Sequence, residues 1–257
     1  MRIGKIESKL TEKIEERGCI LAVLIDPFNQ TTDEAVKIGL SAEKGGSDLI
    51  LIGGSIGAGI KLDETIIELK KSVKIPIVLF PGNVDGVSKY ADAILYMSLL
   101  NSSSPYWIIQ AQALAAPKIL MYNLEAIPTS YLIFEPGEKT AAGWVGMVNP
   151  VPREKSEIAL AYALASMYLG KRWIYLEAGS GASAPVPLEA IKLIAKNTDL
   201  KIIVGGGLKD EVKIRKAVLA GANMIVVGAA VERSLDVKSM VSNFANTIKQ
   251  ASGERKI

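Results

Sequence analysis

The stretch Tyr175-Leu-Glu-Ala-Gly-Ser-Gly-Ala182 joins the end of an apolar run to a glycine-rich turn. The same arrangement recurs in Val204-Gly-Gly-Gly207 and in Val227-Gly-Ala-Ala230. Glycine lets a backbone approach an oxyanion closely, and the N–H groups at a following helix start point at the anion. Successive strand-end turns of this kind late in a chain are typical of the phosphate site of a (β/α)8 barrel. We therefore expect a phosphate group to bind at these turns.

Apolar and β-branched runs on both sides of these turns predict eight strands along the chain. The runs lie at 20–25, 48–52, 76–80, 93–97, 130–134, 173–177, 201–204 and 223–227. Because the runs are apolar without alternation, they predict strands covered on both faces, as in a parallel sheet. Helix-like patterns fill most of the intervals, at 33–45, 62–73, 107–116, 154–169, 187–197, 209–220 and 236–250.

This alternation predicts a single (β/α)8 TIM barrel over residues 1–257, with phosphate-binding loops after strands 6–8. The length of 257 residues is close to that of this fold, which has roughly 250. A doubly wound open sheet is the alternative. A short helix is expected at 4–17 and a frayed tail from about 251 to 257. Segment 81–91 is short and rich in turn formers, so the third crossover should be irregular and leave an opening in the helical ring.

Composition narrows the range of partners. Hydrophobic residues make up 49% of the chain and charged residues 22%, as in ordinary globular domains. The 30 basic and 27 acidic residues are interspersed, so nucleic acid is not expected as a partner. With no signal peptide and no transmembrane segment apparent, we expect a cytoplasmic protein, and peripheral membrane contact stays open. The one cysteine, Cys19, lies in an apolar run and favours a buried thiol in a reducing compartment.

Histidine is absent from the chain. That excludes the commonest general base, the commonest metal ligand, and any Ser–His or Cys–His nucleophile. The chemistry must therefore depend on carboxylates, hydroxyls, lysine, backbone dipoles or a hard cation.

The first two predicted strands end in oxygen-bearing side chains, Asp26 and, after two glycines, Ser55. In a barrel, the carboxyl ends of the strands surround the active site. Magnesium commonly takes one or two protein ligands and completes its shell with phosphate oxygens and water, so this pair could hold Mg2+. The alternative is that Asp26 caps a turn and the glycines only permit a tight loop.

The sixth predicted strand places Tyr175 and Glu177 on one side, because they are two residues apart. Glu177 could bind a substrate hydroxyl or accept its proton; alternatively, a neighbouring lysine could pair with it. Aromatic and apolar residues also gather in the middle of the chain, where they could form core or an apolar groove near the irregular crossover. They are Tyr90, Tyr96, Met97, Tyr106, Trp107, Tyr131 and Phe134.

Taken together and in order, these motifs resemble the geranylgeranylglyceryl phosphate synthases. These are archaeal prenyltransferases of the TIM-barrel class, related to bacterial heptaprenylglyceryl phosphate synthases. The resemblance runs from residue 24 to about 232. It is carried by Leu24-Ile-Asp-Pro27, Ile52-Gly-Gly-Ser55, Pro76-Ile-Val-Leu-Phe-Pro-Gly82, Leu99-Leu-Asn-Ser102, Tyr131, Tyr175-Leu-Glu-Ala-Gly-Ser-Gly181, Val204-Gly-Gly-Gly207 and Val226-Val-Gly228.

The resemblance implies transfer of a geranylgeranyl group from its diphosphate to the C3 hydroxyl of sn-glycerol 1-phosphate. The products are 3-O-geranylgeranyl-sn-glyceryl 1-phosphate and diphosphate, in archaeal ether-lipid biosynthesis. It also implies Mg2+ at Asp26 and Ser55, catalytic roles for Asp26 and Glu177, and a homo-oligomer. The implied acceptor-binding residues are Tyr175, Leu176, Glu177, Ala178, Gly179, Ser180, Gly181, Gly206, Gly207, Gly228 and Ala229. The family often has Asn where this chain has Ala229, so only a backbone contact would survive there.

Three other functions stay open at this point. A bacterial-type homologue would use a longer prenyl diphosphate, and the length of the apolar groove decides between the two. Another phosphate-binding barrel enzyme, such as an aldolase or an isomerase, is a second candidate. Aldolases of this type need a Schiff-base lysine on a barrel strand, and the predicted strand interiors carry almost none. A non-catalytic phosphometabolite-binding barrel is the third.

Overall fold

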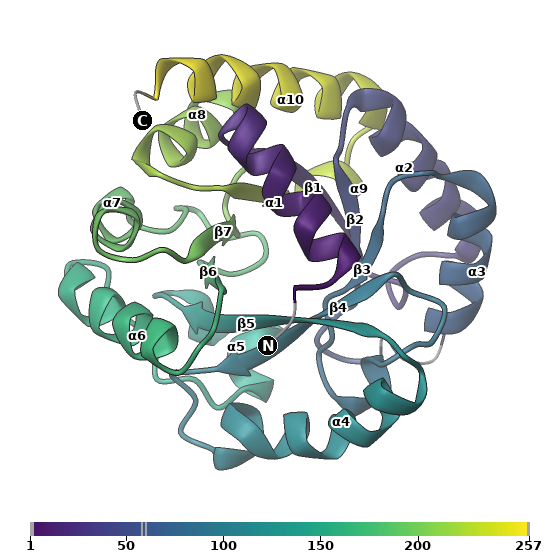
Figure 1. The fold of residues 1–257 in the computed structure, drawn as a ribbon. Helices are drawn as coiled ribbons and strands as arrows, with labels where there is room; N and C mark the ends of the chain where they lie inside the picture. The colour runs from purple at the N-terminus through teal and green to yellow at the C-terminus, as the bar shows by residue number, and fades with distance from the viewer. Residues whose placement is uncertain (1–2, 58, 60, 256–257) are drawn as a thin grey trace.

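The computed structural model describes residues 3–57, 59 and 61–255, and its eight strands form a closed parallel barrel (Figure 1). The strands pair in sequence order, and β1 also pairs with β8 to close the sheet. They are β1 (Ile20–Ile25), β2 (Leu49–Ile52), β3 (Ile77–Leu79), β4 (Ala93–Leu99), β5 (Glu125–Ile133), β6 (Trp173–Glu177), β7 (Lys201–Gly205) and β8 (Met224–Val227). The TIM barrel predicted from the sequence is confirmed.

Helices surround the barrel and follow the strands in turn (Figure 1). They are α1 (Lys5–Arg17), α2 (Thr32–Gly45), α3 (Leu62–Ser72), α4 (Ala111–Met121), α5 (Ala141–Val145), α6 (Ser156–Tyr168), α7 (Leu188–Asn197), α8 (Glu211–Ala220), α9 (Ala229–Glu232) and α10 (Val237–Glu254). Shorter turns are the 3-10 helices η2 (Val84–Gly86) and η4 (Gly137–Lys139) and the π-helix η3 (Tyr106–Gln110). Between β3 and β4 there is no α-helix, only η2, so the irregular third crossover is confirmed.

The barrel has two apolar cores because its strand residues alternate between the two faces of the sheet. On β6, Ile174 and Leu176 pack between sheet and helices, whereas Trp173 and Tyr175 fill the barrel interior. Helix α1 crosses the amino-terminal end of the barrel and adds Leu10 to the interior core (Figure 1). This end is therefore closed, and ligands must enter at the carboxyl ends of the strands.

Charged groups hold α1 in this position. The buried Glu7 carboxylate accepts hydrogen bonds from Arg172 Nε at 2.6 Å and from Trp173 Nε1 at 2.9 Å. At the start of the helix, the N–H groups of Ile6 and Glu7 donate to the Glu125 carboxylate at 2.8 and 2.7 Å. These contacts satisfy N–H groups that a helix start leaves without intrahelical partners.

The predicted frayed tail is wrong for the described residues. Helix α10 continues to Glu254, with Ala251 fully buried. The Arg255 guanidinium then donates to the carbonyl oxygens of Gly18, Val218 and Ala222. Residues 256 and 257 lie outside the described part of the chain. No helix in that described part has the length and apolarity required to cross a membrane.

Candidate functional site

Two cavities open at the carboxyl ends of the strands and share one wall. The apolar cavity, of about 240 Å³, runs from Asp26 past Phe80 to Trp107. The glycine-lined cavity, of about 350 Å³, lies over Gly206, Gly207 and Gly228. The shared wall consists of Leu24, Glu177, Ser180, Gly228 and Ala229. Glu177 is therefore within reach of a ligand in either cavity.

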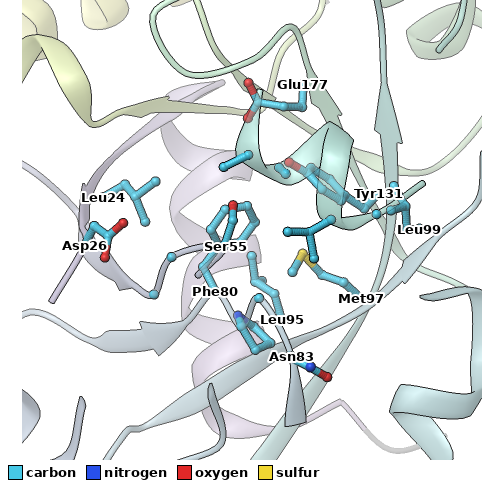
Figure 2. Close-up of a pocket in the computed structure, with 18 of the residues that line it drawn as sticks. Leu24, Asp26, Ser55, Phe80, Asn83, Leu95, Met97, Leu99, Tyr131 and Glu177 are labelled. Carbon is cyan, nitrogen blue, oxygen red and sulfur yellow. The ribbon is translucent and has the colours of Figure 1, made fainter. Parts of the chain in front are cut away.

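The apolar cavity passes from the barrel interior to the space outside the sheet. Its inner part is lined by Phe80, Leu95, Met97 and Tyr131, which Figure 2 shows around the same space. Its outer part includes Tyr96, on the opposite face of β4 from Met97, and small residues of α4. The passage runs beside η2, where the third crossover lacks a regular helix. A channel of this shape suits a long hydrocarbon chain.

Aromatic rings form a rigid floor beneath the inner part of the cavity. Phe80 stacks on Tyr175 with ring centroids 5.0 Å apart, and Tyr131 meets both rings edge-on. Both tyrosine side chains are buried, and burial, followed by the charge of Glu177, raises the pKa of each hydroxyl well above its usual value. These hydroxyls therefore stay protonated and act as hydrogen-bond donors rather than as bases.

Asp26 lies at the end of β1, directed into the apolar cavity (Figure 2). Its carboxylate accepts from the N–H of Phe28 at 3.0 Å and from Asn29 Nδ2 at 3.1 Å, so it does cap a turn. Burial raises the pKa of Asp26, and the Phe28 N–H opposes that shift. Glu232, at the end of α9, lines the same cavity, and its pKa is raised by burial and then by the charge of Asp26. Two carboxylates in one cavity wall produce a negative field that favours a cation.

These oxygen donors fit a hard divalent cation. Asp26 follows β1, Ser55 follows the neighbouring β2, and Glu232 ends α9, the short helix after β8; all three line one cavity. Within the described residues, no group of three or more His, Cys, Asp or Glu side chains is arranged to hold a metal. A cation here would complete its shell with ligand oxygens or water, which is how Mg2+ is usually held. Asp26 and Ser55 are the side chains that could hold it.

Glu177 ends β6 and is buried in the wall that the two cavities share. Figure 2 shows it among the residues that line the apolar cavity. Its Oε1 accepts from the N–H of Gly179 at 2.5 Å. Burial raises the pKa of Glu177 to about 7, against the opposing hydrogen bonds from the Gly179 N–H and the Tyr175 hydroxyl. No ion pair joins it to a lysine or arginine anywhere in the described part of the chain, so the expected alternative of a lysine partner is not observed. A carboxyl with this pKa can exchange a proton near neutral pH.

The glycine-lined cavity has the geometry of an anion site. Gly206 and Gly207 have φ angles of +78° and +69°, which favour glycine and turn the backbone tightly around the cavity. Gly228 precedes α9, a short extra helix after β8. Phosphate sites in (β/α)8 barrels are frequently built from the loops after strands 7 and 8 and the start of such a helix. The glycine turns identified in the sequence therefore line one cavity, and phosphate binding there stays a prediction.

Two basic side chains of this cavity were not predicted from the sequence. Lys209 and Arg233 both line it, and Lys209 Nζ donates to Gly181 O at 3.1 Å. Each follows a glycine turn by a few residues, Lys209 after Gly207 and Arg233 after Gly228. That spacing was an available signal. Their positive charges suit a phosphate group.

Most of the predicted site residues lie together. Tyr175, Glu177, Ser180, Gly181, Gly206, Gly207, Gly228 and Ala229 line the glycine-lined cavity, and Asp26, Ser55 and Gly179 line the apolar one. Leu176 and Ala178 do not line either cavity, because their side chains point outward into the core between sheet and helices. Of the predicted aromatic cluster, Phe134 is likewise fully buried core, whereas Tyr96, Met97, Trp107 and Tyr131 line the apolar cavity.

Comparison with known proteins gives consistent matches over nearly the whole chain. The profile of the PcrB family matches residues 12–248. The geranylgeranylglyceryl phosphate synthase of Korarchaeum cryptofilum (strain OPF8) is 59% identical over 230 residues, which are 90% of this chain and 94% of the relative. The enzyme of the same name from Methanocaldococcus jannaschii is 45% identical over 255 residues, 99% of this chain and 98% of the relative.

Solved structures agree with these sequence matches. The crystal structure of (S)-3-O-geranylgeranylglyceryl phosphate synthase from Thermoplasma acidophilum in complex with its substrate sn-glycerol-1-phosphate superposes with a TM-score of 0.91. It is 34% identical and covers 97% of this chain and 100% of its own. A wild-type enzyme from Thermoplasma volcanium superposes with a TM-score of 0.90 at 38% identity, covering 95% of this chain and 97% of its own.

Proposed function

Because the chain belongs to the PcrB family, we propose that it joins a geranylgeranyl group to the C3 hydroxyl of sn-glycerol 1-phosphate. The substrate is geranylgeranyl diphosphate, and the products are 3-O-geranylgeranyl-sn-glyceryl 1-phosphate and diphosphate. The observation that carries this proposal is the pair of cavities meeting at Glu177, one glycine-lined with two basic side chains and one long and apolar. The related Thermoplasma acidophilum enzyme, crystallised with sn-glycerol-1-phosphate, supports the choice of acceptor.

In this proposal each cavity has its own ligand. The glycine turns, Lys209 and Arg233 hold the phosphate that stays attached to glycerol. The apolar cavity holds the prenyl chain, with its diphosphate directed at Asp26 and Ser55. These two residues would hold Mg2+, which supplies charge neutralisation for the departing diphosphate. The acceptor hydroxyl and C1 of the prenyl chain then meet beside Glu177.

Glu177 orients the acceptor and takes its proton. The bond between C1 and the diphosphate oxygen breaks with carbocation character, and the C3 oxygen of glycerol phosphate forms the ether bond to C1. The hydroxyl proton passes to the Glu177 carboxylate. A carboxyl with a pKa of about 7 is suited to accepting this proton late, because the developing cation makes the hydroxyl acidic. No histidine is required.

The first test is substitution of Asp26 by alanine. We expect Asp26→Ala to lower turnover at least about a hundredfold, as removal of one electrostatic contact to a developing charge does. The fold should persist, because Asp26 is only half-buried. Asp33→Ala, which removes an exposed carboxylate in the first turn of α2, is the matched control. Near-wild-type activity of Asp26→Ala across a magnesium titration would defeat the metal assignment.

The substrates are tested by product mass. The protein is incubated with sn-glycerol 1-phosphate and either a C20 or a C35 prenyl diphosphate, and ether product and released diphosphate are measured with and without magnesium. The proposal expects the C20 ether with magnesium. A preference for C35 would instead assign the longer-chain activity, and binding without diphosphate release would indicate a non-catalytic barrel.

We also propose that the protein is a cytoplasmic homo-oligomer. Large apolar side chains are exposed on three helices that follow one another along the chain: Leu120 on α4, Trp144 on α5 and Tyr168 at the end of α6. Each is more than three-quarters exposed, and pairing of copies would remove this surface from water. The buried, unpaired thiol of Cys19 suits a reducing compartment. Light scattering behind a sizing column tests the assembly, and a monomeric mass would refute it.

A further inference from the structure

The segment leading into α4 contains a π-helical turn, η3, that borders the apolar cavity. π-Helical turns are rare and frequently occur at functional sites, because they widen the helix and redirect its side chains. Here the turn contributes the indole of Trp107 to the cavity wall. The next lining residues along the chain are Ala111, Gln112 and Ala115 of α4, two of which are small. Trp107 is the largest side chain that η3 and α4 place in the cavity wall.

Side chains from outside the turn hold its carbonyl groups. Gln112 Nε2 donates to Trp107 O at 3.0 Å, and Ser98 Oγ of β4 donates to Ile108 O at 2.6 Å. Gln112 Nε2 also donates to Met97 O on β4 at 2.5 Å. The amide of Gln112 thus bridges the barrel strand and the turn that bears Trp107.

The stability of the fold alone does not explain why residue 112 is a glutamine. Gln112 is 9% exposed, and its Oε1 has no hydrogen-bond partner among the residues that the structure describes. The orientation of the amide is fixed, since exchanging its two ends would set an acceptor against two carbonyl oxygens. An apolar side chain of similar length would fill the same volume without a buried, unpartnered acceptor, which is costly. The two bonds made by Nε2 are the distinctive contribution of Gln112.

We propose that Gln112 is a positioning residue for prenyl chain length, acting through Trp107. By tying the carbonyl of Trp107 to β4, it keeps the indole in the wall of the apolar cavity and limits the space left for the prenyl chain. This inference rests on the prenyltransferase function proposed above. Apolar pockets discriminate by roughly 10- to 200-fold per methylene, so a small displacement of the indole alters selectivity strongly.

The test is Gln112→Met, which keeps the side-chain volume and removes both donated bonds. We measure kcat and KM for C20 and C35 prenyl diphosphates and for glycerol phosphate. The expected result is a rise of at least about tenfold in the ratio of kcat/KM for C35 over C20. The KM for glycerol phosphate should not change, because Gln112 does not line the glycine-lined cavity. Gln110→Met, an exposed glutamine in the same turn, is the matched control and should leave the ratio unchanged.

A double-mutant cycle with Trp107→Ala separates positioning from a general loss of structure. If Gln112 acts through Trp107, Trp107→Ala should raise the ratio by itself, and adding Gln112→Met should change it no further. Ser98→Ala, which leaves the amide in place but removes the bond to Ile108 O, should shift the ratio in the same direction by a smaller factor. It also serves as the second variant if Gln112→Met does not fold.

Three outcomes overturn the proposal. If folded Gln112→Met has an unchanged ratio of kcat/KM for C35 over C20, the amide does not control chain length. If Gln112→Met changes this ratio equally with and without Trp107→Ala, Gln112 does not act through Trp107. If the wild-type protein joins neither prenyl chain to glycerol phosphate, the prenyltransferase function itself fails, and this result is distinct from the other two.

Discussion

Glu177 is the carboxylate in the wall that the two cavities share, and its surroundings set its protonation. Its carboxyl group is buried, yet it keeps a hydrogen bond from a backbone N–H that favours the ionised form. Burial outweighs that bond, and the pKa rises from 4.5 to about 7. The group is therefore divided between two protonation states at neutral pH, as a proton-accepting residue requires.

We expect turnover to increase as the pH rises through about 7, because Glu177 must be ionised to accept the acceptor proton. Glu177→Gln should lower kcat by roughly 10²- to 10⁴-fold and abolish this pH dependence. The measurement is the pH profile of kcat for both proteins. A wild-type profile that is flat between pH 6 and pH 8 would contradict a proton-accepting role.

The raised pKa of Glu177 also makes stability depend on pH. The direction is opposite to that of most carboxylates, whose pKa is lowered in the folded state. A raised folded pKa means that the folded state binds the proton more tightly, so the stabilisation is complete below pH 4.5 and is lost as the pH rises through about 7. The loss is about 3 kcal/mol for a shift of this size. Denaturant unfolding of wild type and Glu177→Gln at several pH values should show it only in the wild type.

At the scale of elements, the glycine turns combine two requirements, an unusual backbone angle and a lack of space. Gly206 has φ +78°, and a Cβ atom there would overlap the Glu177 carboxylate and lie 2.6 Å from the N–H nitrogen of Gly179. Gly170, between α6 and β6, has φ +81° but nothing within 4 Å of the Cβ position. Both glycines therefore need a positive φ angle, but only Gly206 also lacks space for a Cβ atom.

We expect Gly170→Ala to lower the free energy of unfolding by about 1 kcal/mol, the cost of a left-handed angle for alanine, with unchanged kinetics. Gly206→Ala should cost more than this, because the new methyl group also overlaps Glu177 and the Gly179 backbone. It should in addition raise the KM for glycerol phosphate at least about tenfold, because it displaces Glu177. Denaturant unfolding and steady-state kinetics of both variants test this. Equal KM values for the two would show that Gly206 is not part of the acceptor site.

The elements that the sequence predicted well are those whose pattern is local. The runs at 20–25 and 173–177 coincide with β1 and β6, because buried parallel strands are apolar throughout. Strand β5 begins earlier than predicted, at Glu125, because it contains Pro128, which a sequence pattern interprets as a break. Helix α4 likewise continues through Pro117 to Met121, beyond the predicted 116. The short helices α5 and α9 had no periodic pattern to detect.

The site was predictable to the extent that it depends on backbone turns at strand ends. The glycine turns and Asp26, Ser55 and Glu177 were identified because a parallel barrel brings all strand ends together. Lys209 and Arg233 were missed although each follows a glycine turn by a few residues. Gln112 was missed because a lone amide residue in a helix has no distinguishing pattern. Tertiary hydrogen bonds decide such positions, as the carbonyl contacts of Arg255 also do for the end of α10.

On the scale of the whole molecule, the two ends of the barrel have different roles: one stabilises the fold and the other holds the cavities. The amino-terminal end is closed by α1 with its buried Glu7, and the cavities lie at the other end. Glu7→Ala should lower the free energy of unfolding by about 3 kcal/mol, because it leaves Arg172 and the indole N–H of Trp173 without their partner. Its kcat and KM should match those of the wild type.

The matched control is Glu254→Ala, which removes an ion pair with Arg215 in which both side chains are about half exposed. Such a pair contributes less than about 1 kcal/mol. Chemical denaturation and steady-state assays of both variants make the comparison. A loss of activity in folded Glu7→Ala would show that the two ends of the barrel are coupled.

The lone thiol gives the protein an internal reporter of strand opening. Cys19 directly precedes β1, is 3% exposed, and burial raises its pKa to about 12. Thiol-directed reagents react with the thiolate, so Cys19 is protected both by burial and by protonation while the barrel is closed. Its rate of alkylation in the native state therefore measures how often β1 separates from its surroundings. The alkylation rate of Cys19 can therefore rank substitutions at either end of the barrel by how much they increase the opening of β1.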